Sequence, residues 1–243
     1  MDNYAEFAKI YDNLIYEDIN YHAMADYIES CFKKMGKKPS LMLDLACGTG
    51  TLTDILSRRG YDMIGADMSY DMLGIAREKN PDILYLCQDM RSLELYGTVD
   101  AVVCMTDSLN YITDYDDLVS VFKLVKNYLN PDAPFIFDLN SRYKLSKIIS
   151  DNTFTYDSEY VSYIWQNEYN EKTNICDFYL TFFVSDDSVH YTRFDEEHCQ
   201  RAYTCDEVKK ALVEAGFTDI NVYDGYSFSE INEKSERLVY TAR

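Results

Sequence analysis

Five short apolar runs, separated by segments with helical periodicity, constrain the fold of this chain most strongly. The runs lack polar–apolar alternation, which is typical of strands buried on both faces of a parallel sheet. They are Leu41–Ala46, Met63–Ala66, Ile83–Cys87, Val99–Met105 and Pro134–Leu139. The helices expected among them are Thr51–Arg59, Ser69–Lys79 and Tyr115–Leu129. This order of elements predicts βαβ units and an α/β fold around a parallel sheet.

The C-terminal part extends the predicted sheet with two further strands. A helix is expected at Asp206–Ala215, and Gly216 follows it as a typical helix terminator. The apolar segments Phe217–Val222 and Leu238–Thr241 are joined by a polar connector without a crossover helix. Strands connected in this way pair antiparallel. We therefore expect seven strands, of which the last is reversed.

Two segments lie outside this α/β pattern. Residues 2–16 and 20–36 each show the spacing of an amphipathic helix. Between residues 151 and 203 the hydrophobic period changes to two, which predicts an antiparallel meander of about three strands. This insert is rich in aromatic residues, so it is either a lid over a site, a small core of its own, or both. We expect a helical cap at 1–40, a ligand-binding domain at 41–150 and 204–243, and an inserted subdomain at 151–203.

Charge and composition argue against several classes of function. The chain has 42 acidic and 23 basic residues, so its net charge is −19. This balance argues against DNA and bulk RNA as partners, because binding to phosphates needs a basic surface. No apolar run approaches the roughly 20 residues of a membrane helix, and the first residues lack the pattern of a secretory signal. A cytoplasmic protein, monomeric or homodimeric, is expected. The seven cysteines form no CxxC pair, so no metal site is expected.

The turn after the first expected strand is the strongest functional signal. Gly48 and Gly50 allow a ligand to approach the backbone closely, just before the N-terminus of a helix. Three acids lie at or near the ends of successive strands: Asp44, Asp67 and Asp89. A carboxylate at the end of the second strand is suited to bind both hydroxyls of a ribose. Met68 and Met90 directly follow two of these acids, where they are able to enclose an adenine ring.

This arrangement resembles that of the class I S-adenosylmethionine-dependent methyltransferases. Asp44-x-Ala46-x-Gly48-x-Gly50 is similar to the first motif of that family, with Ala46 in place of a glycine. The N-terminal segment and the insert resemble a small, uncharacterised clostridial-type branch. The resemblance implies a Rossmann-like fold and S-adenosylmethionine as cofactor. It also implies these cofactor-binding residues: Tyr4, Tyr11, Asp44, Ala46, Cys47, Gly48, Gly50, Asp67, Met68, Asp89, Met90 and Met105.

A nicotinamide dinucleotide is the competing ligand for the same turn. Its G-x-G-x-x-G fingerprint needs a third glycine, but Thr51 or Thr53 stands at that position. The pyrophosphate of that cofactor would also be repelled by Asp44, whereas S-adenosylmethionine carries a sulfonium cation. The turn therefore favours methyl transfer over hydride transfer.

The methyl acceptor is less well defined by the sequence. In the family that it resembles, the segment after the fourth strand faces the transferable methyl group. Candidate catalytic residues are Asp107, Asn110, Tyr111 and, on the insert, His198. Packing or helix-capping roles remain open for all four. The motifs of base amino-group and cytosine C5 methylation are absent, so we expect transfer to nitrogen or oxygen of a small molecule. The alternatives are a non-catalytic S-adenosylmethionine- or S-adenosylhomocysteine-binding module and an RNA methyltransferase.

Overall fold

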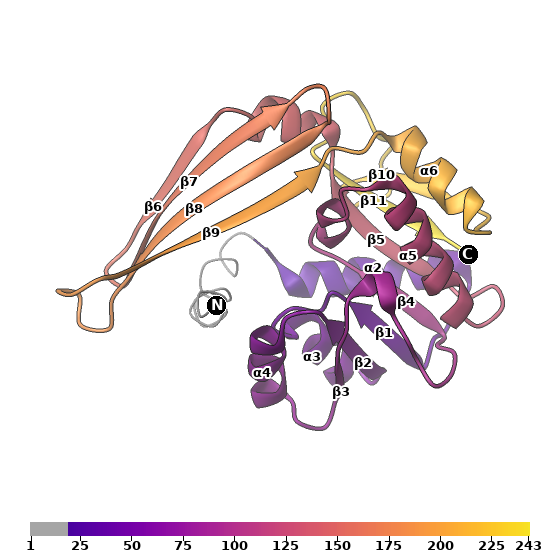
Figure 1. The fold of residues 1–243 in the computed structure, drawn as a ribbon. Helices are drawn as coiled ribbons and strands as arrows, with labels where there is room; N and C mark the ends of the chain where they lie inside the picture. Colours follow the sequence, from indigo (N-terminus) through magenta and orange to yellow (C-terminus); the bar gives the residue numbers. More distant parts are fainter. Residues whose placement is uncertain (1–18) are drawn as a thin grey trace.

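The computed structural model describes residues 19–243, which form two β-sheets with helices packed against the larger one (Figure 1). The helix expected at 2–16, with Tyr4 and Tyr11, lies outside the described residues. The second expected helix is present as α2 (Tyr21–Met35). It begins after Asn20, whose side chain accepts a hydrogen bond from Ala23 N, and it ends at Gly36 in the left-handed conformation.

The main sheet has seven strands in the order β10-β11-β5-β4-β1-β2-β3. Five of them are parallel: β1 (Leu41–Leu45), β2 (Asp62–Asp67), β3 (Leu84–Cys87), β4 (Ala101–Cys104) and β5 (Phe135–Asn140). The sixth is β10 (Asn221–Asp224), and the last, β11 (Arg237–Ala242), runs antiparallel to both β5 and β10. The predicted Rossmann-like sheet with a reversed last strand is confirmed.

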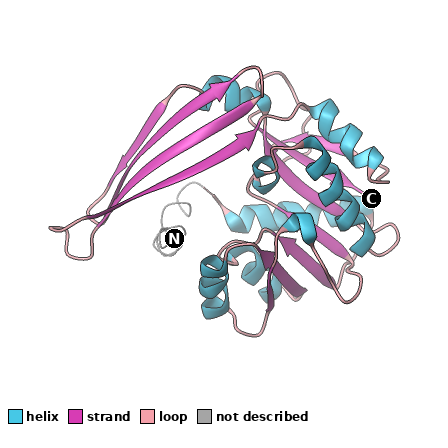
Figure 2. Ribbon diagram, in the orientation of Figure 1, coloured by secondary structure: helices cyan, strands magenta, loops and turns pink. Residues whose placement is uncertain are grey.

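Helices cover both faces of this sheet (Figure 2). One face packs against α5 (Tyr115–Tyr128) and α6 (Cys205–Glu214). The other packs against α2, α3 (Thr51–Arg58) and α4 (Tyr70–Lys79). Both faces of the sheet are therefore buried, which explains why β1, β4 and β5 are mostly apolar and show no polar–apolar alternation. The carboxyl ends of the parallel strands share one edge, where short loops lead on to α3 and α4 and to two 3₁₀ turns, η1 (Met90–Ser92) and η2 (Ser108–Tyr111).

The second sheet is inserted between β5 and α6 and extends away from the main domain (Figure 1). A π-helical turn, η3 (Lys144–Ile149), leads into it. Its strands pair antiparallel in chain order: β6 (Thr153–Asp157), β7 (Val161–Asn170), β8 (Ile175–Val184) and β9 (Thr192–Arg201). The expectation of about three strands missed β6, a five-residue edge strand that pairs only with β7.

The predicted start of the sixth strand was also wrong. The strand was expected at 217–222, but β10 spans Asn221–Asp224. Phe217 is buried instead, and its ring centroid lies 5.6 Å from that of Phe135. The apolar residues after α6 thus mark burial in the core rather than strand pairing. Within residues 19–243, no helix has the length and apolar character needed to span a membrane.

Candidate functional site

The turn after β1 places a left-handed backbone at three positions. Ala46, Gly48 and Gly50 have φ values of 59°, 54° and 71°. A Cβ atom at Gly48 would have no atom within 4 Å, so this part of the turn is open. A Cβ at Gly50 would lie 2.8 Å from both Ala76 Cβ and Tyr85 Oη. Gly50 is therefore required by packing against α4 and β3, whereas Gly48 leaves the backbone accessible to a ligand.

Asp67, the last residue of β2, is bound to this turn. Its Oδ2 accepts a hydrogen bond of 2.8 Å from Gly48 N, and its Oδ1 accepts one of 2.8 Å from Ser69 N. Burial raises the pKa of this carboxyl, and the backbone hydrogen bonds act in the opposite direction. Each carboxylate oxygen has a second lone pair. Asp67 is thus held rigidly with acceptor capacity left for two hydroxyl groups.

Asp44 lies below the turn, inside β1, and is buried. Thr53 Oγ1 donates a hydrogen bond of 2.5 Å to its Oδ2. Burial raises the pKa of Asp44 to about 7, and the charge of Asp67 adds to the shift. Among residues 19–243, no Lys, Arg or His forms an ion pair with Asp44. A buried acid without a counter-cation suits a positively charged ligand.

Asp89 follows β3 by two residues and caps η1. Arg91 Nε lies 3.0 Å from both of its carboxylate oxygens, and this contact lowers the pKa of Asp89. A ligand amino group at Asp89 would therefore share the carboxylate with Arg91. Met68 is 70% exposed next to Asp67, and Met90 is half-buried against the main core.

The remaining predicted cofactor residues differ in accessibility. Cys47 is half-buried in the turn, and its backbone N–H donates to Ala66 O over 3.0 Å. Met105, after β4, is only 2% exposed and packs with the side chains under α2 and α3. It is a core residue among the described residues, and its predicted contact with the cofactor stays a prediction.

Asp107 lies in an ionic network at the end of β4. Its Oδ1 accepts a hydrogen bond of 2.9 Å from Arg237 Nη2, and its backbone N–H donates to Asp138 Oδ1 over 2.6 Å. Asp138 is fully buried in β5, pairs with Arg237 at 3.0 Å and accepts a hydrogen bond of 2.5 Å from Tyr226 Oη. Sequence analysis missed Asp138, Tyr226 and Arg237. An acid within the apolar strand Phe135–Asn140 was the available signal, because such a group needs a cation or hydroxyl partner.

Two buried amides join this network to the second sheet. Gln200 of β9 donates to Asp107 Oδ2 over 2.8 Å and accepts from Asn140 Nδ2 over 3.0 Å. Asn110 has 0% exposure and donates to the carbonyl oxygens of Asn140 and Arg201, over 3.2 and 2.8 Å. Its Oδ1 accepts from Asn140 N over 2.9 Å. Asn110 therefore connects η2 with the ends of β5 and β9, and the catalytic role predicted for it stays a prediction.

Tyr111 and His198, two predicted catalytic residues from distant parts of the chain, are brought together. Their rings meet edge to face, with centroids 6.0 Å apart and planes at 88°. Tyr111 is 46% exposed, so the pair is accessible to a ligand. Burial lowers the pKa of His198 from 6.5, which favours the neutral imidazole at pH 7. A neutral imidazole is able to accept a proton.

The site therefore has two halves at one edge of the main sheet. The half around β1 and β2 contains the open turn at Gly48, the rigidly held carboxylate of Asp67, which is able to accept hydrogen bonds from hydroxyl groups, and the buried carboxyl of Asp44, which forms no ion pair with the described residues. These features fit a cationic adenosyl ligand and do not suit a pyrophosphate. The half around β4 and β9 contains polar and aromatic side chains from both sheets.

Comparison with known proteins gives a consistent result. Residues 42–132 match a family described as a methyltransferase domain. The Bacillus subtilis protein YqeM, itself a provisional methyltransferase assignment, is 36% identical over 99% of this chain and 96% of its own length. The crystal structure of an S-adenosylmethionine-dependent methyltransferase from Clostridium acetobutylicum is 37% identical, covers 99% of this chain and 98% of its own, and has a TM-score of 0.91.

The name of a more distant relative states its methyl acceptor. The dTDP-3-amino-3,6-dideoxy-alpha-D-glucopyranose N,N-dimethyltransferase of Streptomyces fradiae is 30% identical over 56% of this chain and 54% of its own length. Together with the full-length matches, the fold and the site lead to one conclusion: this chain is an enzyme of the class I S-adenosylmethionine-dependent methyltransferase family.

Proposed function

We propose that this enzyme transfers the methyl group of S-adenosylmethionine to a nitrogen or oxygen atom of a small molecule. The contact of Tyr111 with His198 carries the proposal, because it joins the edge of the main sheet to the inserted sheet at the predicted acceptor position. In this proposal both rings contact the acceptor beside the methyl donor. Methyl transfer needs alignment of donor and acceptor and exclusion of water more than strong acids or bases. The Tyr111–His198 contact brings side chains from the main domain and the inserted sheet together for such alignment.

The donor half of the site follows from the turn and its acids. In this proposal Asp67 binds the ribose, Asp89 with Met68 and Met90 binds the adenine, and Asp44 with the turn from Ala46 to Gly50 faces the methionine part. Residues 1–40 are the proposed cap; within them α2 packs against one face of the main sheet, and Tyr4 and Tyr11 are proposed to close over the cofactor. Residues 41–150 and 204–243 form the cofactor domain, and residues 151–203 form the acceptor-binding subdomain.

The four predicted catalytic residues have different proposed roles in the acceptor half of the site. Tyr111 and His198 are proposed to contact the acceptor, with neutral His198 accepting the proton that an amine or hydroxyl group loses. Asp107 and Asn110 are positioning residues, because their side chains are occupied by Arg237, Gln200 and the backbone. The Streptomyces fradiae relative is named as acting on an amino sugar, which makes amines the first acceptors to examine.

A small-molecule acceptor is favoured over RNA by the charges around this half of the site. Arg237 pairs with Asp107 and Asp138, and Arg201 pairs with Glu207. These cations are neutralised within the protein, so they do not add a basic stripe for phosphates. The test is to incubate the purified enzyme with radiolabelled S-adenosylmethionine and separate pools of amines, phenols, sugars and transfer RNA. Label in a small-molecule pool supports the proposal, and label in RNA alone contradicts it.

The same assay needs variants that separate catalysis from folding. His198→Gln is expected to lower turnover at saturating acceptor while cofactor affinity stays unchanged. His190→Gln is the matched control, because His190 is 86% exposed at the turn between β8 and β9 and pairs with Asp187. Equal loss of activity in both variants would exclude a specific role for His198.

A further inference from the structure

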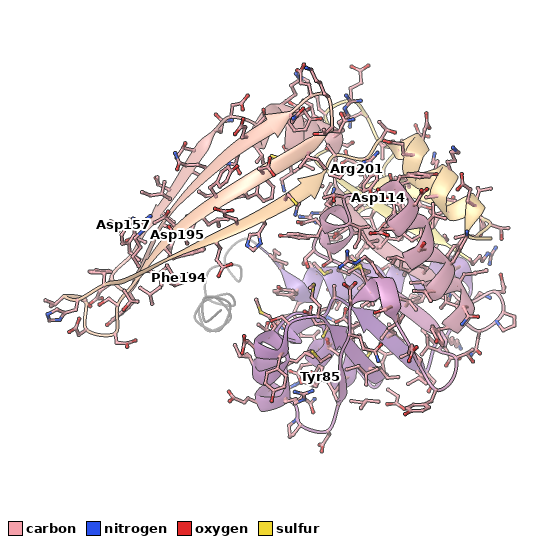
Figure 3. The ribbon with its side chains drawn as sticks, in the orientation of Figure 1. Tyr85, Asp114, Asp157, Phe194, Asp195 and Arg201 are labelled. Carbon is pink, nitrogen blue, oxygen red and sulfur yellow. The ribbon has the colours of Figure 1, made fainter. Side chains whose placement is uncertain are left out.

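One face of the inserted sheet is directed toward the acceptor half of the site. On β9 this inner face carries Phe194, Glu196, His198 and Gln200, which are less exposed than the residues that alternate with them. Gln200 bonds Asp107 and His198 contacts Tyr111, so both meet the edge of the main sheet. In Figure 3, β9 runs between Arg201, beside the main domain, and Asp195 and Phe194, which lie farther from that domain. Glu196 is the next inner-face residue beyond His198.

Glu196 is an unusual residue for this face. It is only 5% exposed, and among residues 19–243 its Oε1 has no hydrogen-bond partner and its carboxylate has no ion pair. Its direct neighbour across the sheet is Leu180. The flanking acids Asp195 and Glu197 point to the opposite face and are exposed, as is usual in a chain of net charge −19. A buried carboxylate without a partner is costly unless a cation or donor joins it.

The inner face of the sheet also carries aromatic rings. Toward the tip of the sheet, Phe194 stacks on Phe182 with centroids 5.1 Å apart. Across β8, Trp165 is in register with Leu180, and its ring meets Phe178 edge to face at 5.5 Å. Trp165 Nε1 is also buried without a hydrogen-bond partner in the described part of the chain. The carboxylate therefore shares its face with Phe194, the next inner-face residue of β9, and with Trp165, on the far side of Leu180. Aromatic rings near a carboxylate favour organic cations.

We propose that Glu196 is the anion of a cation-binding subsite on the inner face of the inserted sheet, on which Phe194 and Trp165 also lie, and that this subsite takes an ammonium group of the methyl acceptor. This subsite rests on the proposed function, since it extends the acceptor site outward from Tyr111 and His198. Adjacent inner-face residues of a strand are roughly 7 Å apart. The ammonium group at Glu196 is thus separate from the atom that receives the methyl group near His198. The acceptor class is a small molecule with two functional groups, one of them a protonated amine.

The negative charge of Glu196 determines which chemical group of a ligand is able to bind there. A phosphate or carboxylate would be repelled by Glu196, and an apolar group would leave its oxygens unsatisfied. An ammonium supplies both a counter-charge and hydrogen-bond donors in a poorly hydrated environment, where such contacts are strongest.

Trp165 is the single tryptophan of the chain, so its fluorescence reports binding on this face directly. The enzyme, saturated with S-adenosylhomocysteine, is titrated with 2-phenylethylamine, and with 2-phenylethanol as the neutral analogue. We expect the amine to quench the tryptophan fluorescence in a saturable way. The alcohol should bind at least about tenfold more weakly, because it lacks one charge-assisted contact with Glu196. Glu196→Gln should weaken amine binding by the same factor. Glu197→Gln, one residue away on the opposite face, should leave it unchanged.

The outcomes separate this proposal from the proposed function. Calorimetric binding of S-adenosylhomocysteine by Glu196→Gln verifies that the cofactor half is intact. Equal amine affinity in the wild-type enzyme and Glu196→Gln, equal affinity for amine and alcohol, or no response to either overturns the subsite. None of these results bears on the methylation assay, in which failure to label any small molecule overturns the proposed function instead.

Discussion

Asp107, at the end of β4, accepts a hydrogen bond of 2.8 Å from the side chain of Gln200, 93 residues further along the chain. This bond ties the inserted sheet to the main domain at the acceptor half of the site. Gln200 is 1% exposed, and its Oε1 accepts from Asn140 in the neighbouring strand. One buried amide therefore connects β9 with Asp107, which follows β4, and with Asn140 of β5.

Replacement of Gln200 by leucine should destabilise the protein. The change leaves Asn140 Nδ2 and an oxygen of Asp107 without their partner in a buried environment, which costs about 1–3 kcal/mol. Urea denaturation measures the loss in the free energy of unfolding. The control is Cys199→Ser, an exposed neighbour on the other face of β9, which should change stability by less than about 0.5 kcal/mol. Equal stability of Gln200→Leu and the wild type would mean that the bond does not hold the two sheets together.

Asp67→Ala should weaken binding of S-adenosylmethionine by about 1–3 kcal/mol, the range for a lost charge-assisted hydrogen bond. Calorimetric titration measures this change. Asp62→Ala removes an exposed acid from the start of the same strand, so it tests whether net charge alone has an effect. If both variants bind the cofactor as the wild type does, the ribose assignment is wrong.

The sequence predicted the main sheet well because its signals are local. Buried parallel strands produce apolar runs, and the turn with its three acids lies at the ends of consecutive strands. β6 and the start of β10 were less well predicted. The local pattern of apolar residues does not reveal a short edge strand such as β6, and it does not show whether an apolar residue such as Phe217 belongs to a strand or to the core. Strand pairing decides between them, and pairing depends on residues far away in the chain.

The acceptor half of the site was predictable only in part. Tyr111 and His198 were chosen separately, and no sequence rule indicated that their rings meet. The bonds of Asp138 with Tyr226 and Arg237 span about 90 or more residues and arise from the return of the C-terminal segment to β5. Such networks are set by tertiary packing. The sequence indicates only that a buried acid like Asp138 must have some partner.

Gly48→Ala should abolish cofactor binding while the fold is retained. The added methyl group meets no protein atom within 4 Å, so it would extend into the space proposed for the ligand. Gly36→Ala is a matched control, because Gly36 has a similar φ of 66°, an equally open Cβ position and a place at the end of α2. Both variants should lose about 1–2 kcal/mol of stability from left-handed strain. Calorimetry should show loss of S-adenosylmethionine binding in Gly48→Ala alone, and equal affinities would exclude the turn as the site.

Cofactor binding should depend on pH through Asp44. Its pKa is raised to about 7 by burial, so the free enzyme holds a proton there at lower pH. A cationic ligand favours the ionised carboxylate, and binding below pH 7 therefore requires release of that proton. We expect the dissociation constant of S-adenosylmethionine to rise by up to about tenfold for each pH unit below 7 and to be constant above it. Calorimetry in two buffers of different ionisation enthalpy counts the protons released. Asp44→Asn should bind more weakly and without this pH dependence, and a wild-type affinity that is the same on both sides of pH 7 would place the cation elsewhere.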